Sequence, residues 1–457
     1  MSSTSSIGSS LIAGSQSSSS SGGLGAGIDV STMVSAAMAN QTAELQQMQG
    51  EQSALTTQQN ALTSFDNDLQ ALSNAVFSLT DPAGVLTSLA TSSSDPAILT
   101  ASAVSGAPTG NTAIVVNNLA TTSSEYSAAV ATSSTPIATG TLQIQVGSNA
   151  PAIITIDNTN NTLSGLAQTI NNANIGVTAS VINDASGARL AIVSNTSGAP
   201  GDLTVTPSGG ALSFTKAVTG VNASLTVNGI PISSSTNAVT GAIPGETLNL
   251  NSADPNTTVT LSTAADVSQQ VTAVNNFVSA YNTVVGDLNA QFQINSSTSQ
   301  AGPLQADSTL ALAQNQILAT ISFAMAGNGN INSLADLGIS MNNDGTLSVN
   351  STTLQSALQA NPSAAQSFFS ATNAGGFGNN LYNQINSIAD PISGSVAQDM
   401  AGLQQSQSDL TQQISDFQNQ LSVTQQQLTT EFDQVDVTLQ ELPLLLQQVN
   451  QQLSSLG

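Results

Sequence analysis

Two long stretches, one near each end of the chain, place an apolar side chain at every seventh residue, and this repeat limits the folds that the chain can adopt. A sevenfold apolar repeat gives a helix one continuous apolar face, which is typical of coiled coils. The expected packing residues of these two helices are Leu45, Met48, Leu55, Leu62, Leu69, Leu72 and Val76 in the first stretch, and Leu410, Ile414, Phe417, Leu421, Leu428, Val435, Leu439 and Leu442 in the last.

Each apolar stripe requires a partner, and the other stripe is the favoured one. Burial of ten large side chains contributes roughly 15 to 30 kcal/mol, at about 1.5 to 3 kcal/mol each. Closing the long intervening chain into a loop costs only about 5 kcal/mol. We therefore expect the two stripes to pair, although a local bundle around each stripe remains an alternative. Gln52 and Gln59 fall in the first seam, where polar residues reduce stability and can specify register.

Between the two stripes the sequence changes to short β-branched runs, such as "TLQIQVG" and "RLAIVS", separated by Gly, Asn and Pro. The sequence therefore predicts an α+β multidomain protein, in which the N- and C-terminal segments form a helical coiled-coil leg and β-rich head domains are inserted. The expected parts are a disordered leader (1–27), an N-terminal helical leg (28–80), a β-rich head (81–135 and 222–266), an inserted β-rich head (136–221), a C-terminal leg domain with helices and a small hairpin (267–442) and a terminal helix (443–457).

The composition excludes most enzyme classes. The chain has no His and no Cys, so neither a catalytic triad with His nor a thiolate zinc site can be built from it. A two-carboxylate glycosidase is permitted by residue type, but the absence of Trp and the presence of only three Tyr leave little surface on which a sugar could stack. We expect no enzymatic activity, no catalytic residue, no cofactor and no metal.

Charge and hydropathy exclude two further classes of partner. Lys and Arg together number 2, against 26 Asp and Glu, and a surface with this balance repels nucleic acids and anionic membranes. The strongest apolar run, "LPLLLQQV", is too short to span a bilayer. We expect neither nucleic-acid binding nor membrane insertion.

Several local motifs have a simple structural interpretation. Gly23, Gly25 and Gly27 suggest a phosphate loop, but a serine tract precedes them and Ile28 occupies the third glycine position of that fingerprint. Asp29 or Ser31 is expected to cap the first helix instead.

Asp81-Pro82 is expected to end the first helix, and "TLSGLAQTINNAN" predicts a short amphipathic helix. Asp344-Gly345 predicts a two-residue hairpin turn. The alternative, a calcium loop, lacks its final Glu because Ser351 stands there. Pro443 is expected to kink or interrupt the last helix.

The order of these segments resembles one family, the FliD-type flagellar cap proteins or flagellar hook-associated protein 2. The N-terminal "GLGAGIDVSTMVSAAMANQTAELQQMQ" is similar to that family's Gly-[Leu/Ile]-Asp entry and helical leg. "NTLSGLAQTINNANIGVTASVINDASGARLAIVSNTSG" resembles the flagellin and hook IN motif, and "LTVNGIPI", "SLADLGISMNNDGTLSVN" and the final heptads resemble the family's C-terminal region. The resemblance covers nearly all of the chain after Gly22, whereas the scarcity of Lys and Arg and the presence of Pro443 depart from the familiar pattern.

The resemblance implies a structural assembly factor. It implies a protein exported without a cleaved signal peptide through the flagellar type III system, located outside the cell at the flagellum tip. There it would cap the filament, retain flagellin and promote its folding and polymerisation. The implied partners are flagellin, other copies in a ring-like homo-oligomer, hook-filament junction proteins and an export chaperone. The alternatives are a tip adhesin that binds host glycans or mucin, and a flagellin-like or junction subunit.

Overall fold

The computed structural model describes residues 29–210, 212–293, 301–370 and 375–454, and these divide into two compact units. The first unit contains the described residues up to Leu69, Asp287–Ala313 and the described residues from Ser387 onward. The second contains Gln70–Gly286 and Gln314–Asn386. The leader expected at 1–27 lies outside the described residues.

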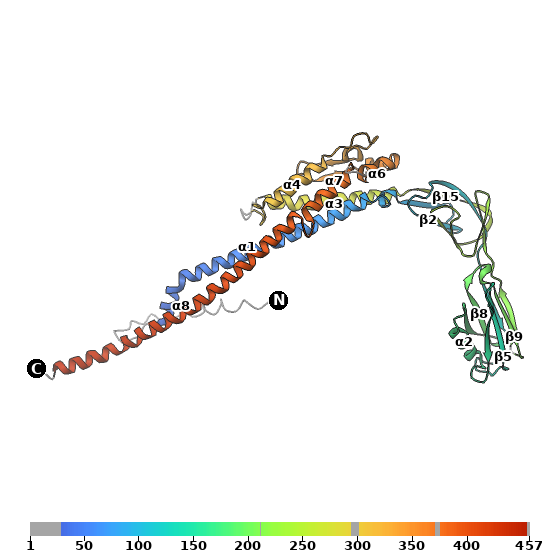
Figure 1. The fold of residues 1–457 in the computed structure, drawn as a ribbon, viewed down its shortest axis with the longest axis horizontal. Helices are drawn as coiled ribbons and strands as arrows, with labels where there is room; N and C mark the ends of the chain where they lie inside the picture. The colour runs from blue at the N-terminus through green and yellow to red at the C-terminus, as the bar shows by residue number, and fades with distance from the viewer. Residues whose placement is uncertain (1–28, 211, 294–300, 371–374, 455–457) are drawn as a thin grey trace. The chain divides into compact units, whose positions relative to one another are not determined.

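The described chain confirms an α+β architecture with long helices towards both ends and a β-rich middle (Figure 1). The helices are α1 (Val30–Thr80), η1 (Val85–Thr87), α2 (Leu163–Asn172), η2 (Ala199–Gly201), α3 (Val267–Phe292), α4 (Ser308–Ile321), η3 (Leu334–Leu337), α5 (Ser351–Ala360), α6 (Pro362–Ser370), α7 (Phe377–Ala389) and α8 (Ser395–Ser454). The strands are β1 (Leu89–Ser93), β2 (Leu99–Ala103), β3 (Gly110–Asn118), β4 (Thr122–Ser127), β5 (Gly140–Val146), β6 (Ala152–Ile156), β7 (Val177–Asp184), β8 (Gly187–Ser197), β9 (Leu203–Ser208), β10 (Phe214–Val218), β11 (Ala223–Val227), β12 (Ile230–Ser234), β13 (Ala238–Thr240), β14 (Glu246–Leu250), β15 (Asp254–Ala265), β16 (Ile339–Met341) and β17 (Leu347–Val349).

Helix α1 begins at a carboxylate cap. Asp29 accepts hydrogen bonds from the backbone N–H of Thr32 (3.2 Å) and from the hydroxyls of Ser31 and Thr32 (both 2.7 Å). These side-chain hydrogen bonds, with Ser31 first, lower the pKa of Asp29 to about 2. Of the two caps expected from the sequence, Asp29 is the one used. The helix ends at Thr80, directly before Asp81-Pro82, because proline cannot continue the hydrogen-bond ladder.

The first head core lies between two antiparallel sheets, ordered β1-β15-β3-β11-β12 and β13-β14-β2. Buried residues alternate with less buried ones along β11 and β14, which places one face of each strand in a shared core. Its fully buried members include Leu99, Ile114, Leu225 and Leu248. Strands β1, β2 and β3 of this core precede residues 136–221, the expected insertion, and its other strands follow them.

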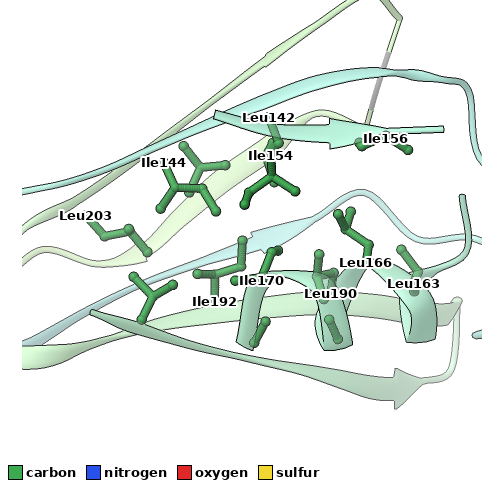
Figure 2. Packing of buried hydrophobic residues seen from close by; sticks show 14 of the residues in the cluster. Leu142, Ile144, Ile154, Ile156, Leu163, Leu166, Ile170, Leu190, Ile192 and Leu203 are labelled. Atoms are coloured by element: carbon green, nitrogen blue, oxygen red, sulfur yellow. The ribbon is translucent and has the colours of Figure 1, made fainter. Parts of the chain in front are cut away.

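The inserted head has a second core, between the sheet ordered β10-β4-β8-β7 and the sheet ordered β6-β5-β9. Helix α2 begins at Thr162, whose hydroxyl accepts a hydrogen bond from the Gly165 N–H (3.0 Å). Its apolar face supplies Leu163, Leu166 and Ile170, all with no exposed surface, and Figure 2 shows them within the core that also holds the inward-facing residues of the strands.

The strand pairing shows that the inserted head begins earlier than the expected boundary at residue 136. The sequence predicts residues 122–135 in the first head, but β4 pairs with β8 and β10 and so belongs to the sheet of the inserted head. The buried face of β4 is polar, with Ser123, Glu125 and Ser127 all almost fully buried. Because these positions lack an apolar alternation, the strand cannot be recognised from the residue pattern alone.

A polar network holds this buried face together. Asp202 accepts hydrogen bonds from Lys216 Nζ (2.9 and 3.0 Å), Ser123 Oγ (3.0 Å) and the Gly220 N–H (2.9 Å). Ser123 Oγ in turn accepts from the Leu203 N–H (2.9 Å). Burial raises the pKa of Glu125, and the positive charge of Lys216 acts in the opposite direction. The network thus joins β4, β9 and β10.

One turn expectation needs correction. The hairpin between β16 and β17 forms, but its loop is longer than two residues: the Asn342 N–H donates to the Thr346 carbonyl (2.8 Å), and the Gly345 N–H donates to the Asn342 carbonyl (3.0 Å). Gly345 has a φ of +83°, so the loop is a turn followed by a left-handed glycine, a common three-residue form. A two-residue loop would have required a left-handed φ at Asp344 as well.

Pro443 lies inside α8 without interrupting it, so of the kink and the interruption expected from the sequence, the interruption does not occur and the kink stays a prediction. Proline removes one backbone N–H and leaves the carbonyl four residues earlier, at Leu439, without its usual donor. This part of the helix is exposed, so water can satisfy that carbonyl. The terminal helix expected as a separate part at 443–457 is therefore, as far as it is described, the end of one 60-residue helix.

Candidate interaction surface on the helical leg

Within the first unit, α1 and α8 run side by side in opposite directions (Figure 1). Three side-chain contacts join them: Gln52 Nε2 donates to Thr411 Oγ1 (2.8 Å), Gln407 Nε2 donates to Thr56 Oγ1 (2.7 Å), and the Thr63 hydroxyl lies 3.8 Å from Met400 Sδ. A step forward along α1 is matched by an equal step back along α8, which defines an antiparallel register.

This register leaves the end of α8 without α1 beside it. The described part of α1 begins at Val30. If the register is extended to that residue, the position opposite it on α8 is Asp433. Helix α8 is described as far as Ser454, so its last turns extend beyond the described part of α1, as Figure 1 shows. Over this length the apolar stripe has no described partner.

The extension carries an exposed apolar row, which we call the α8 end row. Its members follow one another at intervals of four and three residues, so they lie on one face of the helix. Their side chains are between 37% and 64% exposed. No charged residue follows Glu441 in the sequence, so the second half of the row lies on an uncharged surface. The α8 end row consists of Val435, Leu439, Leu442, Leu446, Val449 and Leu453.

The fifteen packing residues expected from the sequence fall into three groups. Five are buried, seven are half-buried, and three, which lie on the α8 extension, are exposed. Buried are Leu62, Leu69, Leu72, Val76 and Ile414; half-buried are Leu45, Met48, Leu55, Leu410, Phe417, Leu421 and Leu428; exposed are Val435, Leu439 and Leu442. The last three depart from the expectation of burial, because the described part of α1 ends before it reaches them.

The last turns of α1 have a different neighbour from the rest of the helix. In the second unit, Phe77 stacks obliquely on Tyr382 (ring centroids 5.7 Å apart), and Ser73 Oγ lies 3.4 Å from Asn386 Oδ1. Both partners belong to α7. At this end of α1, the contacts with α7 correspond to the local-bundle alternative.

Sequence reasoning also missed an aromatic cluster in the second unit. Phe368 and Phe377 stack in parallel with centroids 5.3 Å apart, and Phe277 and Phe369 meet Phe377 edge-on. All four rings have no exposed surface. The phenylalanines are too far apart in sequence to form a periodic signal, although "QSFFS" on α6 is an identifiable apolar pair.

The described residues contain no group of three or more His, Cys, Asp or Glu side chains arranged to hold a metal ion. Among the described helices, none has a stretch both long enough and apolar enough to cross a bilayer. What the leg presents is a seam with polar contacts together with an apolar row whose second half is uncharged, an arrangement suited to binding another apolar helix face.

Two family models match the chain. Residues 26–123 match the model for the flagellar hook-associated protein 2 N-terminus, and residues 220–443 match the model for its C-terminus. Curated relatives include flagellar hook-associated protein 2 of Campylobacter jejuni, 32% identical over 32% of this chain and 24% of the relative. The B-type protein of Pseudomonas aeruginosa is 29% identical over 61% of this chain and 65% of the relative.

The corresponding protein of Helicobacter pylori is 27% identical to this chain over an alignment that covers 31% of it. The chain thus spans 21% of the length of the H. pylori relative and 24% of the C. jejuni relative. Among solved structures, the D1-D2-D3 domains of the flagellar cap protein FliD from Escherichia coli match with a TM-score of 0.64 and 27% identity. That match covers 75% of this chain and 99% of the other.

Proposed function

The chain belongs to the flagellar hook-associated protein 2 family, and we propose that it caps a flagellar filament at its tip. The observation that carries the proposal is the match to a flagellar cap protein over 99% of that protein's solved domains, in the order helical leg, β-rich heads, helical leg. In this role the protein retains exported flagellin and promotes its folding and polymerisation without breaking or forming covalent bonds.

The leg supports this role through its two kinds of surface. The α8 end row is an apolar, mostly uncharged helix face, and burial of its six side chains against a helix of a filament subunit would contribute several kcal/mol. The α1–α8 seam is joined by Gln–Thr hydrogen bonds, which exchange with water at small net cost. A leg with such contacts can release and rebind as subunits add beneath it.

The remaining parts of the proposal concern partners and location. We place the protein outside the cell at the flagellum tip, exported by the flagellar type III system. Flagellin, other copies of the chain in a ring-like oligomer, the hook-filament junction proteins and an export chaperone are its proposed partners. Among the alternatives, a flagellin-like subunit is disfavoured because both family models are those of hook-associated protein 2.

The test is complementation of a strain that lacks the gene. We expect the deletion strain to release monomeric flagellin into the medium and to lack filaments, and the intact gene to restore both. A variant with Leu446→Ser and Val449→Ser should fold with unchanged thermal stability, because both side chains are about half exposed, yet should fail to restore filaments. The matched control is Gln447→Ser with Gln448→Ser, two exposed residues of the same turn.

Each outcome has a distinct meaning. Filaments of normal length in the deletion strain, with no flagellin in the medium, would contradict the capping function itself. Full rescue by the Leu446 and Val449 variant would retain capping and reject the α8 end row as its filament contact.

A further inference from the structure

The single lysine of the sequence lies in the polar network of the inserted head. Lys216 Nζ donates to both carboxylate oxygens of Asp202, to Oδ1 at 3.0 Å and to Oδ2 at 2.9 Å. Because Nζ lies beside both oxygens, it also lies close to the carbon atom that joins them. A reaction between two bound groups requires such an approach, with the reacting atoms about 3 to 3.5 Å apart.

Other donors hold the Asp202 carboxyl group and make its two oxygens different. Oδ1 also accepts hydrogen bonds from the Gly220 N–H (2.9 Å) and from the Ser123 hydroxyl (3.0 Å). The Leu203 N–H in turn donates to Ser123 Oγ (2.9 Å), which orients that hydroxyl towards Asp202. The contact described at Oδ2 is the one with Lys216.

This difference has a chemical meaning. When an amine adds to a carboxyl carbon, one oxygen acquires negative charge and the other departs. Fixed donors directed at the first oxygen stabilise that charge, as they do in an oxyanion hole. The donors around Asp202 therefore assign Oδ1 as the oxygen that is retained and Oδ2 as the oxygen that can leave.

A second carboxyl group faces the same pair. Glu125 on β4 lies directly opposite Lys216 in the β4–β10 pairing, and directly opposite residues extend from the same face of a sheet. The Glu125 side chain is almost fully buried, and burial raises its pKa, although the Val205 N–H and the charge of Lys216 act in the opposite direction. A buried carboxyl group of this kind can accept a proton and return it, as a general acid–base does.

We propose that Lys216 and Asp202 condense in the folded protein to form an intramolecular amide bond, with Glu125 as the proton carrier. The bond between Nζ and Cγ of Asp202 forms, the bond between Cγ and Oδ2 breaks, and Oδ2 leaves as water. Both protons of this water come from the Lys216 ammonium group. Glu125 accepts the first before the attack and returns it to the departing oxygen, and the second is transferred from Nζ as the intermediate collapses.

The step balances without another reactant. An ammonium and a carboxylate become a neutral amide and one water molecule, so neither an oxidant nor a reductant is needed. Well-oriented groups within one molecule react as if at roughly 10⁵ to 10⁸ M, which favours an amide that would not form between separate molecules in water. The side chains of Lys216 and Asp202 are each 33% exposed, so the released water can reach the solvent.

The bond would connect the two sheets of the inserted head. Lys216 belongs to β10, in the sheet ordered β10-β4-β8-β7, and Asp202 directly precedes β9, in the sheet ordered β6-β5-β9. A covalent bond here would keep the sheets joined when the domain is pulled or partly unfolded. The proposal depends on the geometry of the inserted head and is independent of the capping function.

The first measurement is the intact mass of the purified full-length protein after denaturation. We expect a mass lower than that of the sequence by one water molecule. The sequence has no Cys, so a disulfide cannot contribute to the difference. A succinimide formed at an aspartate would also remove water, but it would leave Lys216 open to trypsin, and the second measurement separates the two cases.

The second measurement is digestion of the denatured protein by trypsin, which cleaves after Arg and Lys. Cleavage after Arg189 and Lys216 would give three fragments, residues 1–189, 190–216 and 217–457. A lysine in an amide bond is not cleaved, so we expect two fragments, residues 1–189 and 190–457. Mass spectrometry of the second fragment should show the loss of water within it.

Three variants test the roles of the residues. Lys216→Arg keeps a cation beside Asp202 and a site for trypsin, but its guanidinium stays protonated and cannot attack, so the full mass and three fragments are expected. Glu125→Gln keeps the shape of the side chain without a group that carries a proton, and should also give three fragments. The matched control is Asp184→Asn, which breaks the other ion pair, with Arg189, and should still give two fragments.

The opposite results would overturn the proposal. A natural protein with the full mass of its sequence and three tryptic fragments would show that Lys216 and Asp202 form only an ion pair. Two fragments from Lys216→Arg would mean that resistance to trypsin has another cause. Two fragments and the loss of water in Glu125→Gln would reject Glu125 as the proton carrier.

Discussion

At the scale of single residues, the position of a leucine in the leg determines what it contributes. Leu62 on α1 and Leu312 on α4 have the same side chain and both lie in helices of the first unit. Leu62 has no exposed surface, whereas Leu312 is 62% exposed. Only the first has been transferred from water into a packed interior, so only the first should be costly to truncate.

The corresponding prediction compares Leu62→Ala with Leu312→Ala. We expect Leu62→Ala to lower the free energy of unfolding by about 2 to 5 kcal/mol, because it removes buried methyl groups and leaves a cavity. Leu312→Ala should change it by less than about 0.5 kcal/mol. Chemical denaturation of both variants measures the difference, and equal losses would show that α1 is not packed at Leu62.

At the scale of elements, the α1–α8 pair combines apolar and polar contacts in one seam. Gln52 is half-buried and donates to Thr411 across the helices, although Thr411 also donates to the Gln407 carbonyl on its own helix (2.7 Å). Replacement of Gln52 therefore leaves the Thr411 hydroxyl satisfied. A leucine there would extend the apolar stripe between Met48 and Leu55.

We predict that Gln52→Leu, alone or with Gln59→Leu, raises the stability of the leg by about 0.5 to 1 kcal/mol per site and impairs swimming. The gain comes from added apolar burial, and the functional loss from a seam that no longer releases. Thermal denaturation and motility assays measure the two effects. Gln46→Leu, at an exposed position of the same helix, is the control. Increased stability with unchanged swimming would reject the link between reversible packing and function.

A second prediction at this scale concerns Pro443 in the middle of the α8 extension. Pro443→Ala restores a backbone N–H that can donate to the Leu439 carbonyl, and it favours the local helix by up to about 3 kcal/mol. We expect slower amide exchange at residues 444–447 with little change in the global melting temperature, because this part of the helix is exposed. Gln447→Ala is the control for helix propensity alone. Unaltered exchange in the Pro443 variant would mean that the proline does not weaken the helix.

At the scale of the whole molecule, electrostatics is dominated by repulsion between carboxylates. The formal net charge at pH 7 is −24, and the described chain has two ion pairs, both in the second unit. Added salt screens repulsion over distances larger than the Debye length, about 30 Å at 0.01 M and 8 Å at 0.15 M. For this chain, screening removes more repulsion than attraction.

We therefore predict that the melting temperature rises when the salt concentration is increased from 0.01 M to 0.15 M at pH 7. The rise should shrink at pH 4, where many carboxylates are protonated and the repulsion is already reduced. Scanning calorimetry at the two pH values tests both parts. A fall in melting temperature with salt at pH 7 would show that attractive pairs outweigh the repulsion.

The sequence by itself determined the features that rest on local periodicity and local chemistry. The sevenfold repeat predicted the long helices, Asp81-Pro82 marked the end of α1, and the spacing of Leu163, Leu166 and Ile170 predicted α2. A helix face or a cap depends on residues within a few positions of one another, so it can be recognised from the sequence alone.

Only the tertiary structure decided which surfaces meet. In the structure the polar strand β4 pairs within the inserted head, and the end of α1 packs against α7. Val435 is exposed because it lies beyond the described start of α1. Such contacts depend on register and on the lengths of neighbouring elements. Periodicity shows that one face of a helix is apolar, but it does not show which other element packs against that face.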